Sequence, residues 1–274
     1  MKNSLFTKEN FPILYDKPPG ISPLDSFELI VGPCAIESET QIHAIAHALH
    51  KRGIRYMRGG AFKPRTSPTD FQGLGEEGLK YIRKAADKYR LSVVTEVMST
   101  EDFDLVERYA DILQIGTRNM YNYPLLKRAG RSSKTILLKR GFQATLKEYL
   151  HSVEYIMSEG NRNIILCERG IRSFDPFTRN VLDIASAISL KMNTGLQVII
   201  DPSHATGQAE LVSPLTIAAQ SVDLNGSMIE ISLSPAKAKC DGHQAMTLDA
   251  LDQLLLQLNT YKSMTESSNR IIGS

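Results

Sequence analysis

A short polar stretch, Asp201-Pro202-Ser203-His204-Ala205-Thr206-Gly207, directly follows an apolar run that ends at Ile200. The apolar run is typical of a strand that is buried on both faces. In α/β barrels the carboxyl ends of such strands carry the catalytic groups, and histidine is a common ligand of transition metals. The stretch therefore predicts a functional site at this strand end, provided that other strand ends supply partners for His204.

Four residues at the ends of three apolar runs could bind one metal ion together. Cys34, His204, Glu230 and Asp241 offer a thiolate, an imidazole and two carboxylates. This mixture suits Mn, Fe, Co or Zn and does not suit Mg or Ca. No closely spaced pair of ligands supports the site, and Cys34 alone could be a small buried apolar residue. Spacing by itself leaves a metal site and structural roles open, and we interpret Cys240 as a bystander.

A second group of side chains at the predicted strand ends is cationic, although the whole chain carries a formal net charge of only +2. Guanidinium and ammonium groups suit phosphate oxygens. So many cations in one place would repel one another unless anions lay between them, so we predict a site for more than one phosphate. Some members could instead be solvated or paired with Glu96 and Glu168. The group comprises Arg58, Lys63, Arg65, Arg118, Lys139 and Arg169, with Arg140 and Arg172 nearby.

Eight apolar runs of strand length precede these polar stretches, and amphipathic patterns such as Ile42, Ile45, Ala46 and Leu49 separate them. Strand and helix that alternate eight times predict a single-domain (β/α)8 barrel of the α/β class. A doubly wound open sheet is the structural alternative. The predicted strands cover residues 28–32, 54–58, 91–95, 111–115, 135–138, 163–167, 196–200 and 227–231.

The flanks of the barrel are shorter and less regular. We interpret residues 1–27 as an N-terminal extension with a short strand at 11–14, and residues 28–262 as the barrel. Residues 263–274 form a polar C-terminal tail that we expect to fray.

Composition excludes several classes of protein. A content of 42% hydrophobic and 23% charged residues is ordinary for a soluble globular chain. No apolar run approaches the roughly 20 residues of a membrane span, and the small net charge does not favour nucleic-acid binding. The first residues lack the apolar core of a secretory signal. Three cysteines do not suggest a disulfide framework. We therefore expect a cytoplasmic protein that binds neither membranes nor nucleic acid.

Five motifs together resemble the type I beta subfamily of 3-deoxy-D-arabino-heptulosonate 7-phosphate (DAHP) synthases, and the resemblance spans most of the chain. These enzymes are (β/α)8 barrels that condense phosphoenolpyruvate with erythrose 4-phosphate at the entry to the shikimate pathway. The motifs are Gly-Pro-Cys-Ala-Ile-Glu-Ser (32–38), Arg-Gly-Gly-Ala-Phe-Lys-Pro-Arg-Thr-Ser-Pro (58–68), Leu-Lys-Arg-Gly (138–141), Cys-Glu-Arg-Gly-Ile-Arg (167–172) and the stretch 201–207.

The resemblance implies a role for each group of strand-end residues. One divalent metal ion would be ligated by Cys34, His204, Glu230 and Asp241. Phosphoenolpyruvate would be held by Arg118, Lys139 and Arg169, with Arg58 and Lys63 close to it and Asp201 in support. Erythrose 4-phosphate would meet Lys63, Pro64, Arg65 and Thr66. The catalytic set would be Lys63, Glu96 and Lys139 together with the metal ligands Cys34 and His204.

Two alternatives stay open beside this interpretation. The related 3-deoxy-D-manno-octulosonate 8-phosphate (KDO8P) synthases use arabinose 5-phosphate, but they have Lys-Ala-Asn-Arg-Ser-Ser where this chain has Lys63-Pro64-Arg65-Thr66-Ser67. That difference favours the four-carbon aldose. A barrel that binds sugar phosphates without turnover is the second alternative. The chain departs from the family at Ser232, where Val-His-Pro usually follows the glutamate, and this puts the surroundings of the metal in question.

The resemblance also bears on assembly and regulation. Relatives are commonly homodimers or homotetramers, so we expect a homo-oligomer. The short extension leaves no room before the barrel for the regulatory or chorismate mutase domain of many relatives. Any feedback control would then come from a regulatory partner protein.

Overall fold

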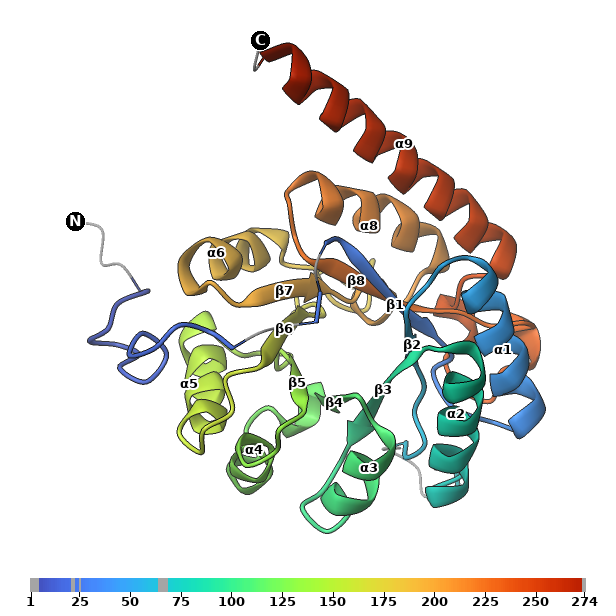
Figure 1. Cartoon of the computed structure of the whole chain (residues 1–274), viewed down its shortest axis with the longest axis horizontal. Helices are drawn as coiled ribbons and strands as arrows, with labels where there is room; N and C mark the ends of the chain where they lie inside the picture. The colour runs from blue at the N-terminus through green and yellow to red at the C-terminus, as the bar shows by residue number, and fades with distance from the viewer. Residues whose placement is uncertain (1–4, 21–22, 25, 64–68, 273–274) are drawn as a thin grey trace.

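Eight parallel strands close into a barrel in the computed structural model, which describes residues 5–20, 23–24, 26–63 and 69–272 (Figure 1). Each strand pairs with the next, and β8 pairs with β1 over five residues, so the sheet has no free edge. The predicted (β/α)8 barrel is confirmed, and the open sheet is wrong. The strands are β1 (Glu28–Gly32), β2 (Tyr56–Arg58), β3 (Ser92–Val97), β4 (Ile112–Ile115), β5 (Thr135–Lys139), β6 (Ile164–Glu168), β7 (Gln197–Ile200) and β8 (Gly226–Glu230).

Helices surround the barrel and cover the outer face of its strands (Figure 1). Their starts are fixed by local capping, which satisfies backbone N–H groups that have no partner inside a helix. Ser38 accepts a hydrogen bond from the backbone of Gln41, and Thr145 and Glu148 cap each other's backbone. The helices are α1 (Glu39–Lys51), α2 (Glu76–Tyr89), α3 (Phe103–Tyr109), α4 (Tyr123–Gly130), α5 (Leu146–Met157), α6 (Ile184–Thr194), α7 (Pro202–Thr206), α8 (Val212–Ser221) and α9 (Leu248–Ile272).

The inside of the barrel is packed by one layer of apolar side chains to which every strand contributes. Since side chains alternate between the two faces of a strand, the residue two positions after each layer member also points inward, closer to the carboxyl end. The layer therefore predicts which strand-end residues face the mouth of the barrel. Its members are Leu24, Ile30, Tyr56, Val94, Ile112, Leu137, Ile165, Cys167, Ile199 and Met228.

The N-terminal extension covers the opposite end of the barrel. Leu24 belongs to the interior layer, and the Tyr56 hydroxyl donates to the Pro23 carbonyl at 2.6 Å. The short strand expected at 11–14 is wrong, because these residues form turns that bury Phe11 and Leu14. The backbone N–H of Ile13 donates instead to the Glu154 carboxylate of α5. The extension is thus docked on the barrel by packing rather than by pairing with a strand.

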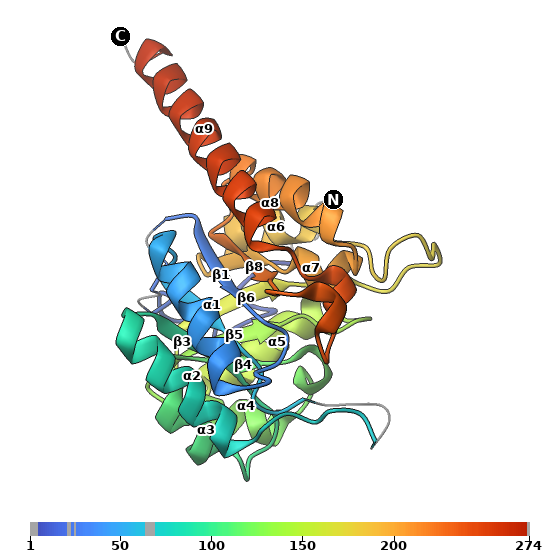
Figure 2. The same cartoon turned by 90° about the vertical axis from the view of Figure 1, so that its right-hand side faces the viewer.

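The last helix projects away from the barrel, as Figures 1 and 2 both show. Its first turns bury Leu251, Leu254 and Leu258, whereas Leu256 and Met264 are largely exposed. We expected a frayed tail from residue 263, but α9 continues to Ile272. No helix within the described part of the chain combines the length and apolarity that a membrane crossing requires.

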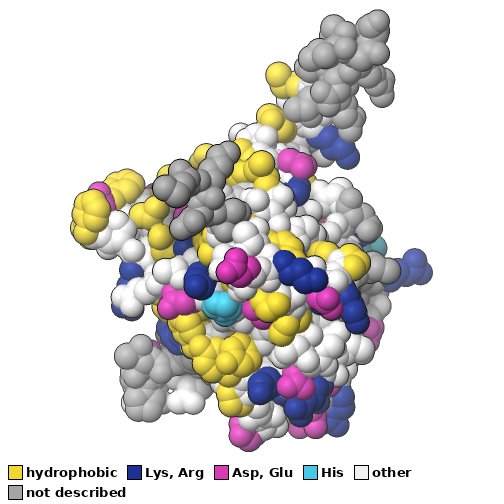
Figure 3. Space-filling view, turned by 90° about the vertical axis from the view of Figure 1, so that its left-hand side faces the viewer, with side chains coloured by type: hydrophobic (Ala, Val, Ile, Leu, Met, Phe, Trp, Pro, Cys, Tyr) yellow, Lys and Arg dark blue, Asp and Glu magenta, His cyan; other side chains and the backbone are white. Residues whose placement is uncertain are grey.

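One face of the molecule gathers apolar side chains. Figure 3 shows them in yellow on the side that lies at the left of Figure 1. The exposed large apolar residues of the described chain include Tyr121, Tyr123, Phe174 and Phe177, the last two 100% and 75% exposed. Tyr123 stacks on Tyr155 with ring centroids 4.3 Å apart. Exposed apolar side chains that form a patch commonly mark contact with another macromolecule.

Candidate active site

A cavity of about 510 Å³ opens at the carboxyl ends of the strands. Cationic side chains outnumber carboxylates among the described residues that line it, so the cavity favours anions. The lining residues are Arg58, Lys63, Asp70, Glu96, Gln114, Gly116, Thr117, Arg118, Lys139, Phe142, Arg169, Arg172, Arg179, Asn180, His204 and Asp241.

Strand alternation explains how the barrel aims its polar groups at this cavity. Arg58, Glu96, Lys139 and Glu230 each follow a member of the interior layer by two positions and therefore point inward. The same rule applies to Gln114, which our sequence analysis missed. Its side-chain amide donates to Glu96 Oε2 at 3.1 Å. The alternation from Ile112 could have identified it.

The four predicted metal ligands converge. One donor atom from each of Cys34, His204, Glu230 and Asp241 lies within 4.8 Å of the other three. Glu230 is fully buried, and its Oε1 lies 3.0 Å from Arg58 Nη1 and 3.1 Å from His204 Nε2 without a directed hydrogen bond to either among the described residues. A buried carboxylate oxygen without a directed donor is stabilised only by such charges, so it keeps the capacity to bind a further cation. The donor set and this oxygen both fit a borderline divalent ion.

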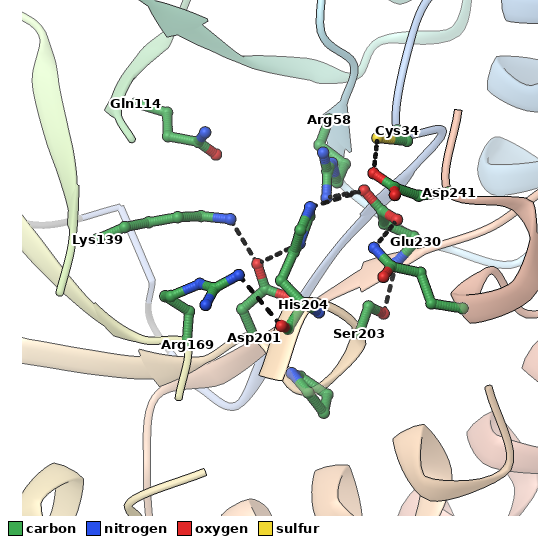
Figure 4. A network of polar contacts seen from close by, with 12 residues as sticks. Cys34, Arg58, Gln114, Lys139, Arg169, Asp201, Ser203, His204, Glu230 and Asp241 are labelled. Atoms are coloured by element: carbon green, nitrogen blue, oxygen red, sulfur yellow. Dashed lines mark hydrogen bonds and ion pairs between the residues drawn. The ribbon is translucent and has the colours of Figure 1, made fainter. Parts of the chain in front are cut away.

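His204 is oriented by Asp201 (Figure 4). Asp201 Oδ1 caps α7 by accepting from the backbone of His204 at 3.0 Å, and Oδ2 lies 2.8 Å from the imidazole Nδ1. This leaves Nε2 directed at the other ligands. Burial opposes the charged imidazolium, but the carboxylates of Asp201 and Glu230 raise the pKa of His204 to about 9. A metal ion would have to displace this proton.

The Cys34 thiol contacts two groups beyond the predicted ligand set. Cys240 Sγ lies 3.3 Å from Cys34 Sγ, and Lys63 Nζ lies 3.1 Å from it. The hydrogen bond with Cys240 and burial raise the pKa of Cys34. Cys240 thus approaches the site and lies directly beside the ligand thiol, while its role as a bystander to the chemistry stays a prediction.

Two buried cations face the cavity next to the ligand cluster. Lys139 is ion-paired with Asp201, and both side chains are almost completely buried. Arg169 donates to the His204 carbonyl at 3.1 Å and stacks on the Phe142 ring, while its Nη1 is buried without a partner among the described residues. Burial lowers the pKa of Arg169. A bound anion would offset this cost, so the structure favours an anion beside Arg169.

The structure divides the other predicted cations. Arg118 and Arg172 are exposed and line the cavity rim. Arg140 points the other way, because it follows the inward Lys139 by one residue, and it pairs with Glu168 and Asp183 behind the strands. It therefore serves the structure, which is the role we left open for ion-paired members of the group.

Three further predictions concern Asp201, residues 64–66 and Ser232. Asp201 lies beneath Lys139 and His204 and is fully buried, so we assign it to their positioning rather than to direct substrate contact. Pro64, Arg65 and Thr66 lie outside the described residues. The backbone of Ser232 donates to the Met246 carbonyl, which extends the parallel bridge beside Glu230. These bonds hold the backbone beside Glu230, and an altered surrounding of the metal at Ser232 stays a prediction.

Residues 23–267 match the DAHP synthetase I family. The chain belongs to this family. It is 47% identical over 232 residues to phospho-2-dehydro-3-deoxyheptonate aldolase of Thermotoga maritima, an alignment that covers 85% of this chain and 69% of the relative. It is 30% identical to 2-dehydro-3-deoxyphosphooctonate aldolase of Syntrophotalea carbinolica, with 84% and 88% covered.

Solved structures agree with the sequence comparison. The crystal structure of the Thermotoga maritima DAHP synthase superposes with a TM-score of 0.88 at 42% identity and covers 95% of this chain and 77% of that one. A truncated form of the same enzyme gives a TM-score of 0.84 at 39% identity, with 95% and 97% covered. The family is generally metal-dependent, and the four-residue cluster of this chain is a possible metal site.

Proposed function

We propose that this chain condenses phosphoenolpyruvate with erythrose 4-phosphate and water to give DAHP and inorganic phosphate. The observation that carries the proposal is the single cavity that joins a four-ligand metal cluster to the buried cations Lys139 and Arg169. One face of such a site can hold a phosphorylated carboxylate, and the other can hold an aldehyde oxygen. Family membership supports the same assignment.

The cations would bind and orient phosphoenolpyruvate. Arg169 offers a buried guanidinium edge, Lys139 an ammonium group, and Arg118 a third cation at the rim. Arginine binds phosphate or carboxylate oxygens through two parallel hydrogen bonds. Holding both reactants in attack geometry converts a bimolecular step into an intramolecular one, which can lower the barrier by several kcal/mol.

The metal would be held by Cys34, His204, Glu230 and Asp241, where it would act as a Lewis acid toward the aldehyde oxygen of the aldose. In the condensation, C3 of phosphoenolpyruvate bonds to the aldehyde carbon, and water adds to C2. The resulting hemiketal phosphate then collapses to the keto group and releases inorganic phosphate. The metal belongs to the Mn, Fe, Co and Zn group, since the site contains both thiolate and imidazole.

We propose that Lys63 delivers a proton to the alkoxide that forms from the aldehyde. Burial alone would lower the pKa of Lys63, but the negative charges of Cys34 and Glu230 raise it above the ordinary value. The side chain is therefore an ammonium that lies 3.1 Å from a metal ligand. A general acid in hydrogen-bond reach of the reacting oxygen typically contributes 10²–10⁴-fold to the rate.

We propose that Glu96 activates the water that adds to C2. Gln114 holds one of its carboxylate oxygens at 3.1 Å. A Cβ at position 116 would come within 1.9 Å of the other oxygen, so only glycine leaves room for it. These two neighbours hold the carboxylate at the cavity wall, near Arg58 and Lys63, and we propose that Lys139 shares the proton transfer.

The test is phosphate release by the purified protein with phosphoenolpyruvate and either erythrose 4-phosphate or arabinose 5-phosphate, with and without a metal chelator. We expect chelator-sensitive turnover with the four-carbon aldose and, at equal concentration, at least tenfold less with the five-carbon one. Preference for arabinose 5-phosphate would assign the chain to KDO8P synthesis. Tight binding of phosphoenolpyruvate without phosphate release would make it a binding barrel.

We also infer that the chain forms a homodimer or homotetramer. Support comes from the apolar face of Figure 3 and from the exposed Tyr121, Tyr123, Phe174 and Phe177. Light scattering after size-exclusion chromatography would show a monomer of 30.5 kDa if the inference is wrong. We also propose that a regulatory partner protein binds this chain. Chromatography of the protein mixed with cell extract would detect the partner as a second chain that elutes with it, and an activity assay of that fraction would show altered feedback inhibition.

A further inference from the structure

Each carboxylate ligand of the cluster has one oxygen that contacts a group outside the cluster, through a hydrogen bond in Glu230 and an ion pair in Asp241. Glu230 Oε2 accepts a hydrogen bond from the Gln244 side-chain amide at 2.5 Å, while Oε1 faces His204 Nε2 at 3.1 Å. In Asp241, Oδ1 lies 3.6 Å from Arg179 Nη2, while Oδ2 lies 3.1 Å from Cys34 Sγ. The two carboxylates therefore present a single oxygen each to the centre of the cluster.

Gln244 and Arg179 form one connected unit. Arg179 Nη1 donates to Gln244 Oε1 at 3.0 Å. Because a guanidinium has no acceptor, this contact fixes the orientation of the Gln244 amide, so that its NH₂ group must face Glu230. Gln244 is fully buried, which prevents water from replacing either partner. The unit is thus a donor chain from Arg179 through Gln244 to Glu230.

The unit also joins loops that come from different strands. Arg179 lies between β6 and α6, and its backbone N–H donates to the Thr206 carbonyl at the end of α7. Gln244 and Asp241 belong to the segment after β8, where the Gln244 backbone donates to the Asp241 carbonyl at 3.2 Å. Three segments that supply or flank His204, Glu230 and Asp241 are therefore tied together at the wall of the cavity that Arg179 lines.

We propose that Gln244 and Arg179 are positioning residues that hold Glu230 and Asp241 in one-oxygen ligation of the metal ion and thereby set its affinity and coordination number. The proposal rests on the metal site of the proposed function but not on its substrates. A donor on the outer oxygen of a carboxylate opposes ligation through both oxygens, and outer partners of metal ligands are typically worth 10–100-fold in affinity.

The variants are Gln244→Met, which keeps length but removes the donor, and Arg179→Met, which removes the far end of the unit. Arg179 is partly exposed, so its variant does not depend on repacking a buried site. Gln208→Met is the matched control, because Gln208 donates to the Phe177 carbonyl in a neighbouring loop and touches no ligand. Circular dichroism of each variant confirms the fold before metal is added.

The readouts are the Kd for Zn²⁺ and Co²⁺, from competition with a chromophoric chelator, and the visible spectrum of the Co²⁺ form, which reports coordination number. We expect Kd to rise 10–100-fold in Gln244→Met and at least threefold in Arg179→Met, with a changed Co²⁺ spectrum in both. Because Gln244 does not line the cavity, kcat of Gln244→Met should recover at saturating metal. Gln208→Met should match the parent protein. Unchanged Kd and unchanged spectra in both folded variants would overturn the proposal. Failure of the substrate proposal would appear separately, as normal metal binding without phosphate release.

Discussion

Asp201 is the best single position at which to test the arrangement of the site, because it is fully buried and serves two functional side chains. Its Oδ2 meets both the Lys139 ammonium and His204 Nδ1, while its Oδ1 caps the backbone of His204. In Asp201→Asn the single amide oxygen can replace only one of these acceptors. Either orientation places an NH₂ group against a buried donor.

The size of the effect follows from these contacts. Two unit charges about 3 Å apart attract by about 5 kcal/mol at an effective dielectric constant of about 20, and removing one partner of a buried pair costs about 3–5 kcal/mol. Lys139 is 4% exposed, so water compensates little. At about 2–4 °C per kcal/mol for a domain of this size, Tm should fall by about 10 °C. Loss of the imidazole's partner should weaken metal binding 10–100-fold.

The assay combines thermal unfolding of the metal-free protein with a metal titration of Asp201→Asn. Asp252→Asn is the control, since it breaks an exposed ion pair with Arg52 and should cost less than about 1 kcal/mol. If Asp201→Asn kept both Tm within 2–4 °C (about 1 kcal/mol) and the parent metal affinity, the positions we assign to Lys139 and His204 would not depend on Asp201. The reasoning would then be refuted.

Three further predictions concern other parts of the molecule. Lys63→Met should lower kcat at least 100-fold with little change in the KM for phosphoenolpyruvate, measured at saturating metal. Hydrogen peroxide should oxidise the Cys34 and Cys240 thiols to a disulfide with release of two waters, and the protein should then lose its capacity to bind metal. The prediction is contradicted if mass spectrometry finds both thiols intact, or if Cys240→Ser loses as much metal-binding capacity as the parent protein. In Asp183, burial is outweighed by its hydrogen bonds and by Arg140, which keep its pKa below the ordinary value. Its ion pair should therefore stabilise the fold above about pH 4 and be lost as pH falls further, so that Asp183→Asn lowers Tm at pH 7 but progressively less below pH 4.

Alternation within strands made much of the site predictable from sequence. Arg58, Glu96, Lys139 and Glu230, at or next to the ends of their strands, point inward because of their position after the apolar layer. The metal ligand among them, Glu230, could be predicted from its chemical type. The same rule separates Lys139 from Arg140, which a list of cations near strand ends does not do. Gln114 was not predicted because the search for strand-end groups considered charged side chains and metal ligands. Its inward position follows from Ile112 by the same alternation.

The contacts of the loops could not be predicted in this way. Arg179, Gln244 and Cys240 reach the ligand cluster from segments that have no period, and their contacts depend on how the loop after β6 meets the one after β8. The extension of α9 beyond residue 263 was not predicted for a related reason. A polar helix that buries no face has no apolar period, so its sequence looks the same as that of a disordered end. Burial imposes an apolar pattern on the sequence of strands, whereas polar helices and loops show no such pattern.

The charges around the cavity show why metal and substrate should bind interdependently. Glu230 lies 3.0 Å from Arg58 and 3.1 Å from His204, yet its Oε1 makes no directed hydrogen bond with either, so these contacts are electrostatic rather than geometrically satisfied. A metal ion at this oxygen would compete with Arg58 for the carboxylate. Arg58, which lines the same cavity, would then offer more of its positive charge to an anion. Metal binding should therefore strengthen phosphoenolpyruvate binding, and by linkage the substrate should strengthen metal binding by the same factor.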